Sequence, residues 1–316
     1  MPLMPVVLWT DALVFLLIAL AVAFALYARR HEHLRAPWRR VLVSRVGMAS
    51  LVVLGLYVLI GLLDTVHFRL PLQDQPAGAP TQFAPEVLSL LDLVHSPLRE
   101  GQEKTNSAPF ATQLFVKEPV PQPDGSVLRD FPRLVYGGAH LEDPGQRGLD
   151  ILIRGLWGAL LGLAVWGLIG WLLPWILARR EGRTPAQMRA LIREGRTRVP
   201  WRAILITLLQ VLFLDGLAAN LALRYHILGT DKVGEDVFYQ ALKSIRTGLV
   251  IGTLTTLVML PAAILLGIMA GYFRGWVDDV IQYLYTTLNS IPGGILIAAA
   301  ILLLQVYMSN NAERFE

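Results

Sequence analysis

Four polar side chains near the end of the chain have the types and the spacing to line a path for a polar solute. Gln282, Thr286, Asn289 and Ser290 fall at i, i+4, i+7 and i+8, and Gly293 follows at i+11. A helix would place all five on one face. Amide and hydroxyl groups that face a wet cavity can replace water around a solute without the cost of burying a charge. Hydrogen bonding between the helices of a bundle explains the same pattern equally well.

A second group of polar residues lies in the run HILGTDKVGEDVF, which begins at His226. Gly229 permits a tight turn, and Thr230 and Asp231 can accept hydrogen bonds from free amides at the start of the next helix. From Val237 the apolar residues recur at helical spacing, which predicts an amphipathic helix of about three turns along a membrane surface. The pattern favours a role in fixing the angle of membrane re-entry over direct contact with a solute.

The other reactive side chains do not form a catalytic or metal-binding set. The sequence has no cysteine, and its six histidines lie in loops or at the ends of apolar segments. It contains no H-E-x-x-H, G-x-S-x-G, Walker A or G-x-G-x-x-G motif. His31, Glu32 and His33 lie between arginines, as is typical of a solvated polar loop. We therefore expect no enzymatic activity, resident cofactor or metal ion in this chain.

The composition predicts that these residues are carried by membrane-spanning helices. Hydrophobic residues make up 54% of the chain and charged residues 16%, whereas soluble domains have about 25% charged residues. Six segments approach the length of about 20 apolar residues that a helix needs to cross a bilayer. The sequence therefore predicts an all-α integral membrane protein with about six transmembrane helices. The predicted spans are residues 6–27, 41–63, 151–177, 201–223, 249–270 and 281–306.

The arginines indicate which connections face the cytoplasm. Five arginines and one glutamate lie between the first two spans, and seven arginines and two glutamates lie between the third and fourth. Both connections are predicted to be cytoplasmic, which puts the N-terminus outside. No basic stretch precedes the first apolar segment, so an uncleaved span is favoured over a signal peptide. No basic patch with interleaved aromatic residues occurs, and we expect no nucleic-acid binding.

The segment of residues 64–150 is rich in proline and is predicted to lie outside. Proline removes a backbone donor and breaks helices, so we expect irregular structure with a short helix near 85–93 and a hairpin around Asp124 and Gly125. A linker packed on the membrane helices is favoured over a docking surface for a partner. The chain is thus divided into residues 1–63 with two spans, 64–150 outside, 151–200 with one span and a basic linker, and 201–316 with three spans.

The last third of the chain resembles the permease subunits of bacterial ABC importers of the dipeptide, oligopeptide and nickel class. In that family the corresponding run reads roughly HPLGTDxxGRD, then ARxSL, a span, GYxGGxxD, a second span and a proline. The matching residues here are His226, Leu228, Gly229, Thr230, Asp231, Gly234, Asp236, Arg246, Gly271, Tyr272, Gly275, Asp278 and Pro292. Two positions differ, because Ile227 stands where proline is usual and Glu235 where the family has arginine.

The resemblance also covers the connection between the last two spans. Tyr272, Gly275 and Asp278 lie in a short turn that is predicted to be cytoplasmic, with Gly275 at the bend. The resemblance puts this turn on the side where ATPase subunits dock. Gly267 and Gly271 form a G-x-x-x-G pattern, which lets two helix backbones approach closely.

The resemblance implies a permease subunit in the bacterial inner membrane that forms part of a pathway for peptides or similar small polar solutes. The implied partners are a second permease subunit, two cytoplasmic ATPase subunits that bind ATP and magnesium, an external substrate-binding protein and membrane lipid. The family core has about three further spans and a Glu-Ala-Ala coupling loop that this sequence lacks, so we expect the remainder to follow or to be supplied separately. A non-transporting membrane scaffold or assembly protein is the alternative. Because a binding protein supplies much of the selectivity in such systems, the sequence does not distinguish dipeptides, oligopeptides and nickel as substrates.

Overall fold

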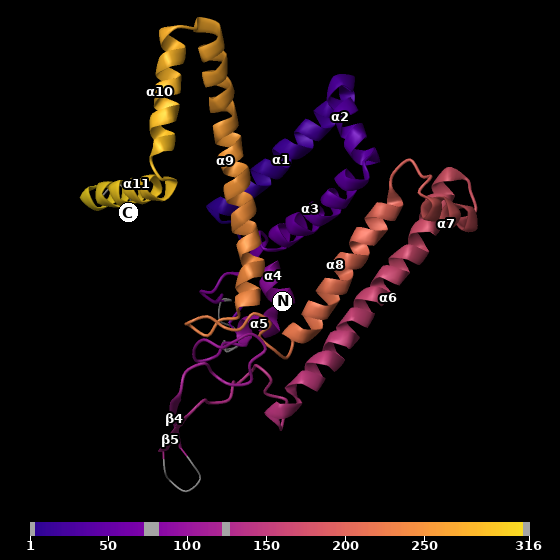
Figure 1. Cartoon of the computed structure of the whole chain (residues 1–316), viewed down its shortest axis with the longest axis vertical. Coiled ribbons are helices and arrows are strands. Elements are labelled where there is room, and N and C mark those ends of the chain that lie inside the picture. Colours follow the sequence, from indigo (N-terminus) through magenta and orange to yellow (C-terminus); the bar gives the residue numbers. More distant parts are fainter. Residues whose placement is uncertain (1–3, 73–81, 122–126, 312–316) are drawn as a thin grey trace. The chain divides into compact units, whose positions relative to one another are not determined.

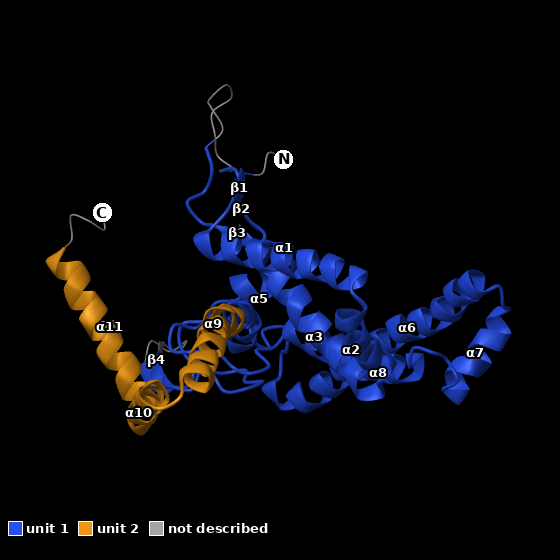
Figure 2. Cartoon of the chain, turned by 90° about the horizontal axis from the view of Figure 1, so that it is seen from above, with its two compact units in different colours: residues 1–250 blue, residues 251–316 orange. Residues whose placement is uncertain are grey.

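The computed structural model describes residues 4–72, 82–121 and 127–311 and consists mostly of helices (Figure 1). The helices are α1 (Trp9–Arg30), α2 (Glu32–Val43), α3 (Arg45–Leu63), α4 (Leu90–Val94), α5 (Ser96–Glu100), α6 (Arg147–Glu181), α7 (Pro185–Glu194), α8 (Trp201–Ala222), α9 (Val237–Phe273), α10 (Trp276–Ser290) and α11 (Gly293–Asn310). The strands are β1 (Met4–Val6), β2 (His67–Arg69), β3 (Leu88–Ser89), β4 (Glu118–Pro121) and β5 (Val127–Asp130). The chain forms two compact units, residues 1–250 and 251–316 (Figure 2).

Six of the described helices are long and apolar enough to cross a membrane, namely α1, α3, α6, α8, α9 and α11. This confirms the prediction of an all-α integral membrane protein. The first and second predicted spans correspond to α1 and α3. The residues between them form a separate helix, α2, and α3 begins after Ser44, whose hydroxyl oxygen accepts a hydrogen bond from the Gly47 amide at 3.2 Å. This is the usual N-cap arrangement.

The longest contact between helices in the first unit joins α6 and α8, which run antiparallel and side by side (Figure 1). Gly158 and Gly162 of α6 face Gly216 and Leu212 of α8. A Cβ atom on Gly162 would lie 2.1 Å from the carbonyl oxygen of Leu212, and one on Gly158 would lie 2.3 Å from that of Gly216. Only glycine allows this approach. The G-x-x-x-G pattern at 158–162 was not among the sequence predictions.

The described residues of the proline-rich segment, 64–72, 82–121 and 127–150, contact the ends of helices of the first unit, including α3 and α9. Strands β1, β2 and β3 form an antiparallel sheet, so the residues before α1 pair with those after α3. The predicted short helix is present but begins later, at Leu90. Strands β4 and β5 pair antiparallel, as expected for a hairpin; Asp124 and Gly125, its predicted turn, lie outside the described residues.

The second unit differs from the prediction at its last span. The sequence predicts one helix over 281–306, but the structure has two helices, α10 and α11, separated at Ile291 and Pro292. Proline has no backbone donor and disfavours helical backbone in the residue before it. Ile291 is accordingly extended, with φ −86° and ψ 127°. The membrane-spanning candidate is therefore α11 alone.

A second difference lies at the start of α9. The predicted surface helix after Val237 is not separate, because α9 continues without a break from Val237 to Phe273. Neither Gly248 nor Pro261 ends it. The polar side chains of its first turns contact the proline-rich segment instead, as described below.

We predict that Gly162→Val destabilises the protein by about 1–3 kcal/mol or more, because the added side chain would collide with the backbone of α8. The measurement is the thermal midpoint of the purified protein in detergent. Gly170→Val on the same helix is the matched control, since nothing lies within 4 Å of a Cβ atom there. An equal shift for both variants would contradict the packing role of Gly162.

Candidate functional site

Three charged residues meet at the start of the HILGTDKVGEDVF run, and we call Glu103, His226 and Asp236 the His226 clasp. The imidazole Nδ1 donates to Asp236 Oδ2 at 2.7 Å, and Nε2 lies 3.4 Å from Glu103 Oε1. The exposed fractions of the three side chains are 6% for His226, 1% for Glu103 and 2% for Asp236. The clasp thus joins Glu103 to His226 and Asp236, which lie 123 and 133 residues farther along the chain.

The electrostatics of the clasp favour the charged forms of His226 and Glu103. Burial alone would lower the pKa of His226, but Asp236 and Glu103 raise it to about 9. Burial alone would raise the pKa of Glu103, but His226 and the backbone amides of Val135, Tyr136 and Gly137 lower it to about 2. Those amides donate to the Glu103 carboxylate at 2.7–3.0 Å. A buried pair is stable only when its remaining hydrogen-bonding positions are filled in this way.

Two glycines bring the backbone of the run against the proline-rich segment. Gly234 has φ +83°, and a Cβ atom there would lie 1.8 Å from the carbonyl oxygen of Glu103. The Glu103 amide donates to the Gly234 carbonyl oxygen at 2.8 Å. Gly229 has φ +78° and approaches the Ser107 carbonyl oxygen, where a Cβ atom would lie at 2.3 Å. The tight turn predicted at Gly229 is confirmed, and both positions exclude a side chain.

The predicted helix caps are corrected by the structure. The hydroxyl of Thr230 donates to the Thr105 carbonyl oxygen at 2.9 Å, and Asp231 accepts from the amides of Val233 and Glu235 within its own loop. Neither residue caps α9. That role belongs to Asp236, whose carboxylate accepts a hydrogen bond from the Tyr239 amide at 3.0 Å. Asp236 immediately precedes the helix, which is the position where a side-chain acceptor satisfies a free amide.

Glu235 occupies the position where the family has arginine. Its carboxylate is exposed and accepts a hydrogen bond from the Gln240 amide group at 2.8 Å, and the same group donates to Asp231 at 2.9 Å. The local charge is therefore reversed at the surface, while the buried clasp is complete without an arginine.

A second cluster, centred on the buried side chain of Tyr225, joins α6 to the residues that follow α8. The Tyr225 hydroxyl donates to Asp150 Oδ2 at 2.7 Å, and Arg154 Nε and His140 Nε2 reach the same oxygen at 2.8 and 2.7 Å. Burial and the Asp150 carboxylate raise the pKa of Tyr225. Tyr225 directly precedes His226, so this cluster and the clasp fix adjacent residues.

The first turns of α9 contact two further carboxylates. The Tyr239 hydroxyl donates to Asp92 at 2.5 Å, and Lys243 Nζ lies 2.9 Å from the same side chain. One turn farther along, Arg246 pairs with Asp11 of α1, and His67 Nδ1 lies 2.9 Å from the other oxygen of Asp11. These contacts connect α9 to α4, α1 and β2.

A polar groove of about 490 Å³ lies beside these contacts. Its lining includes the carboxylates of Asp64 and Asp92 and the cations Lys243 and Arg246. Asp64 Oδ1 is buried and has no hydrogen-bond partner among the described residues, and burial raises the pKa of Asp64. The groove is lined by both signs of charge, and the chain itself pairs Lys243 with Asp92 and Arg246 with Asp11.

The residues of the predicted pathway do not share one helix. Gln282, Thr286, Asn289 and Ser290 lie on α10, whereas Gly293 begins α11 after the break at Pro292. The expectation of five groups on a single helical face is therefore wrong for Gly293. The four remaining residues are exposed on α10, and their role in a pathway stays a prediction.

The inner turn forms as expected between α9 and α10. Gly275 has φ +55° and ψ −131° and stands at the N-cap of α10, with Tyr272 exposed in the last turn of α9 and Asp278 in the first turn of α10. An acidic side chain there complements the helix dipole. Nothing in the described chain lies within 4 Å of a Cβ atom built on Gly267 or Gly271, so their packing role also stays a prediction.

The partners of His226 could not be identified from the sequence. Glu103 lies in a segment without helical or strand periodicity. A buried, charged histidine is expected to pair with an acidic residue, but this rule does not say which one. The glycine contact between α6 and α8 did have a signal, because Gly158 and Gly162 repeat the spacing on which the Gly267 and Gly271 prediction relied.

Comparison with known proteins finds curated relatives of part of this chain. A stretch of 85 residues is 34% identical to the glutathione transport system permease protein GsiD of Pectobacterium atrosepticum and covers 27% of this chain and 28% of that protein. A stretch of 73 residues is 33% identical to the oligopeptide transport system permease protein OppC of Mycobacterium tuberculosis and covers 23% of this chain and 25% of that protein. The chain thus spans about a quarter of the length of the curated relatives that it matches. No family model matches, and no solved structure matches. The resemblance to importer permease subunits is confirmed over this part of the chain.

We predict that His226→Gln lowers the stability of the purified protein by about 3–5 kcal/mol near pH 6, because removing one partner leaves the two buried carboxylates uncompensated. The pKa of His226 is above its ordinary value of 6.5, so its stabilisation is complete below that pH and is lost as the pH rises through about 9. The pKa of Glu103 is below its ordinary 4.5, so its contribution is lost as the pH falls from 4.5 towards about 2. The measurement is the thermal midpoint in detergent from pH 5 to pH 9.

The matched control is His33→Gln, which changes an exposed histidine on α2. In His33→Gln the thermal midpoint should fall between pH 6.5 and pH 9 as it does in the wild type. In His226→Gln the thermal midpoint should change much less over the same range. A decline of the same size in both variants would show that His226 is not the titrating group.

We also predict that Asp11 and Arg246 are energetically coupled, because the partly buried guanidinium of Arg246 pairs with the buried carboxylate of Asp11. Asp11→Asn and Arg246→Gln should each cost about 3–5 kcal/mol, and the double variant should cost clearly less than the sum. The thermal midpoints of the three variants measure the coupling. Strict additivity would argue against a direct ion pair.

Proposed function

We propose that this chain provides part of a permease subunit of an ATP-driven importer for peptides or similar small polar solutes. The observation that carries the proposal is the similarity of a stretch of 85 residues to the permease protein of a glutathione transport system and of a stretch of 73 residues to the permease protein of an oligopeptide transport system. The six candidate spans and the absence of a P-loop in the sequence support a transport subunit whose ATPase partners are separate chains.

The His226 clasp supports a positioning role for the family motif. Apart from the surface residues of the run, its polar groups are paired with Glu103, Thr105 and Ser107 of the proline-rich segment. Paired, buried groups are unsuited to binding and releasing a solute. We propose that the motif holds the start of α9 in place, and that solutes are contacted elsewhere.

The second unit supports the need for a partner. None of its described residues, 251–311, is buried, and large apolar side chains such as Met259, Ile268 and Leu303 are more than 60% exposed. In a membrane these surfaces are covered by lipid or by another protein. The exposed polar residues of α10 would not be stable against lipid, and we propose that they face a second permease subunit across a wet pathway.

The transport cycle would follow alternating access driven by the partners. An external binding protein would deliver the solute, and two cytoplasmic ATPases would bind ATP with magnesium near the turn at Gly275. In this scheme the chain performs no phosphoryl chemistry. The N-terminus would lie outside, in the inner membrane of a bacterium, as the arginines of α2 and α7 indicate.

Uptake of labelled solutes tests the proposal. Cells with the complete protein and its partners should accumulate labelled di- or oligopeptides, and deletion of the protein should abolish the uptake of at least one of them. Thr286→Val combined with Asn289→Leu should reduce uptake about tenfold, because both changes remove polar groups from the proposed pathway.

Thr287→Val is the matched control, since Thr287 is an equally exposed neighbour on a different face of α10. Membrane abundance must be equal in all strains. Unchanged uptake of every peptide, glutathione and nickel on deletion would contradict transport and favour the alternative of a membrane scaffold or assembly protein.

A further inference from the structure

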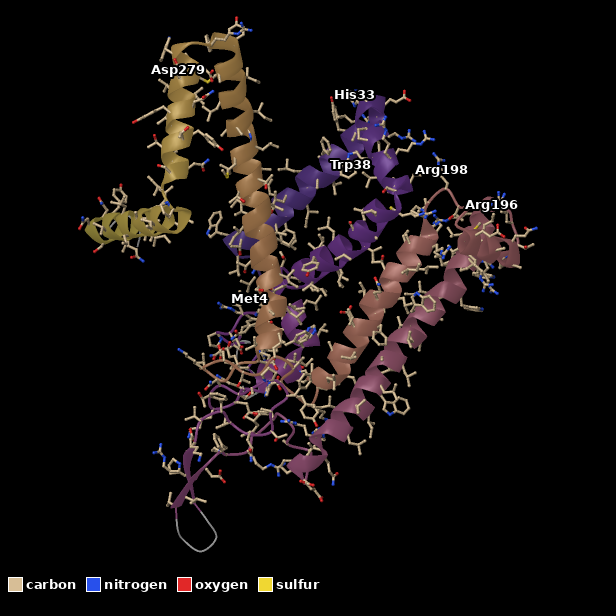
Figure 3. The ribbon with its side chains drawn as sticks, in the orientation of Figure 1. Met4, His33, Trp38, Arg196, Arg198 and Asp279 are labelled. Carbon is tan, nitrogen blue, oxygen red and sulfur yellow. The ribbon has the colours of Figure 1, made fainter. Side chains whose placement is uncertain are left out.

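The arginines of α2 surround a hollow that the proposed transport function does not use. The hollow has a volume of about 670 Å³ and lies between the end of α1, α2 and the loop before α8. Its apolar lining includes Phe24, Leu42 and Val199, and its charged lining consists of four arginines, Arg29, Arg35, Arg39 and Arg198. Figure 3 labels Trp38 on α2 and Arg198 before α8, both of which line it.

The four arginines carry positive charge that the chain does not neutralise. Among the described residues, no carboxylate lies within ion-pair distance of any of them. Three of them also line an adjacent hollow of about 830 Å³, together with Arg30 and Arg40. Only one acidic side chain, Glu32, lines that second hollow. A strongly cationic site without a counter-charge is suited to an anionic ligand.

The lining between the arginines is suited to an acyl chain. Phe24, Trp38 and Leu42 are 50%, 53% and 46% exposed, although they are large apolar residues grouped around one hollow. A soluble anion such as phosphate or a nucleotide would bind the arginines but would not cover this apolar surface. A ligand with an anionic head and a hydrocarbon tail would cover it.

The position of the hollow along α1 agrees with such a ligand. Arg29 and Arg30 end a candidate membrane span, and the end of a span lies at the level of the lipid headgroups. Tryptophan is enriched at this level, and arginine stems extend to it from the membrane interior. Basic hollows between helices at the cytoplasmic surface are a recurrent form of anionic-lipid site.

We propose that the hollow bounded by Arg29, Arg35, Arg39 and Arg198 binds an acidic phospholipid, with its phosphate among the arginines and an acyl chain along Phe24, Trp38 and Leu42. The lipid links α1 and α2 to the connection that leads into α8. It occupies a place where, in the described structure, these elements leave a gap between them.

Lipid binding to the purified complete protein in detergent tests the proposal, with phosphatidylglycerol as the probe and phosphatidylcholine as the neutral comparison. Native mass spectrometry counts the lipids retained at each concentration. Wild-type protein should retain phosphatidylglycerol at about tenfold lower concentration than phosphatidylcholine. Arg39→Gln with Arg198→Gln should weaken phosphatidylglycerol binding by about 25-fold, at about fivefold for each arginine, and should leave phosphatidylcholine binding unchanged.

The matched control is Arg189→Gln with Arg193→Gln, which removes two exposed arginines of α7 from the same basic connection but not from the hollow. Its lipid binding should equal that of the wild type. Leu42→Ser should weaken the binding of phosphatidylglycerol while the arginines are intact, and equal thermal midpoints confirm that the variants are folded.

Three results would overturn the proposal. Equal retention of the two lipids would show that the hollow does not select an acidic headgroup. An acidic protein segment would then be the better candidate partner for the arginines. Equal weakening in the α7 control would assign the effect to net charge. Displacement of phosphatidylglycerol by an equal concentration of inorganic phosphate or glycerol 3-phosphate would show that the hollow recognises a free phosphate and that the acyl chain contributes nothing.

Discussion

The buried imidazole of His226 is the contact on which the arrangement of the first unit depends. It holds a carboxylate on each side, and both carboxylates also bind backbone amides. Glu103 accepts hydrogen bonds from three amides of residues 135–137, and Asp236 caps α9. Loss of the imidazole would leave two buried carboxyl groups without the cation between them. One side chain thereby controls the fold of the proline-rich segment and the start of the longest helix.

Polar contacts extend from this point to the ends of the neighbouring helices. Tyr225, the residue before the histidine, is fixed by Asp150 of α6, and Arg246 of α9 is fixed by Asp11 of α1. The helices of the first unit are thus joined at one end by hydrogen bonds and ion pairs, whereas α6 and α8 are joined along their length by glycine contacts. Buried polar groups need hydrogen-bond partners, which the contacts at the helix ends supply. Within the membrane, glycine allows two helix backbones to pack closely.

The sequence predicted well what depends on local patterns and poorly what depends on distant residues. Hydropathy identified the spans, and the φ values of Gly229 and Gly275 agree with the turns that glycine predicted. The break at Pro292 could have been foreseen, because a proline within an apolar run either kinks a helix or ends it. The apolar residues on both sides of Pro292 favoured one continuous helix, which was wrong. The contact between Glu103 and His226 could not have been foreseen. No sequence periodicity links the proline-rich segment to a loop so far along the chain. Assigning the cap of α9 to Thr230 and Asp231 failed for a related reason, because Thr230 has its partners in that same segment and Asp231 binds amides of its own loop and the side chain of Gln240.

The close approach of Gly234 to Glu103 also has a consequence for the order of biosynthesis. Glu103 leaves the ribosome more than a hundred residues before His226, and at about 5–20 residues per second this interval is on the order of ten seconds. During that time two further candidate spans, α6 and α8, are made, while the Glu103 carboxylate has its amide donors in residues 135–137 but not yet His226. The contacts of this segment with His226, Thr230 and Gly234 therefore form only after the loop that follows α8 has been made. The packing of the first unit is therefore completed late in the synthesis of the chain, once residues 226–236 can reach Glu103.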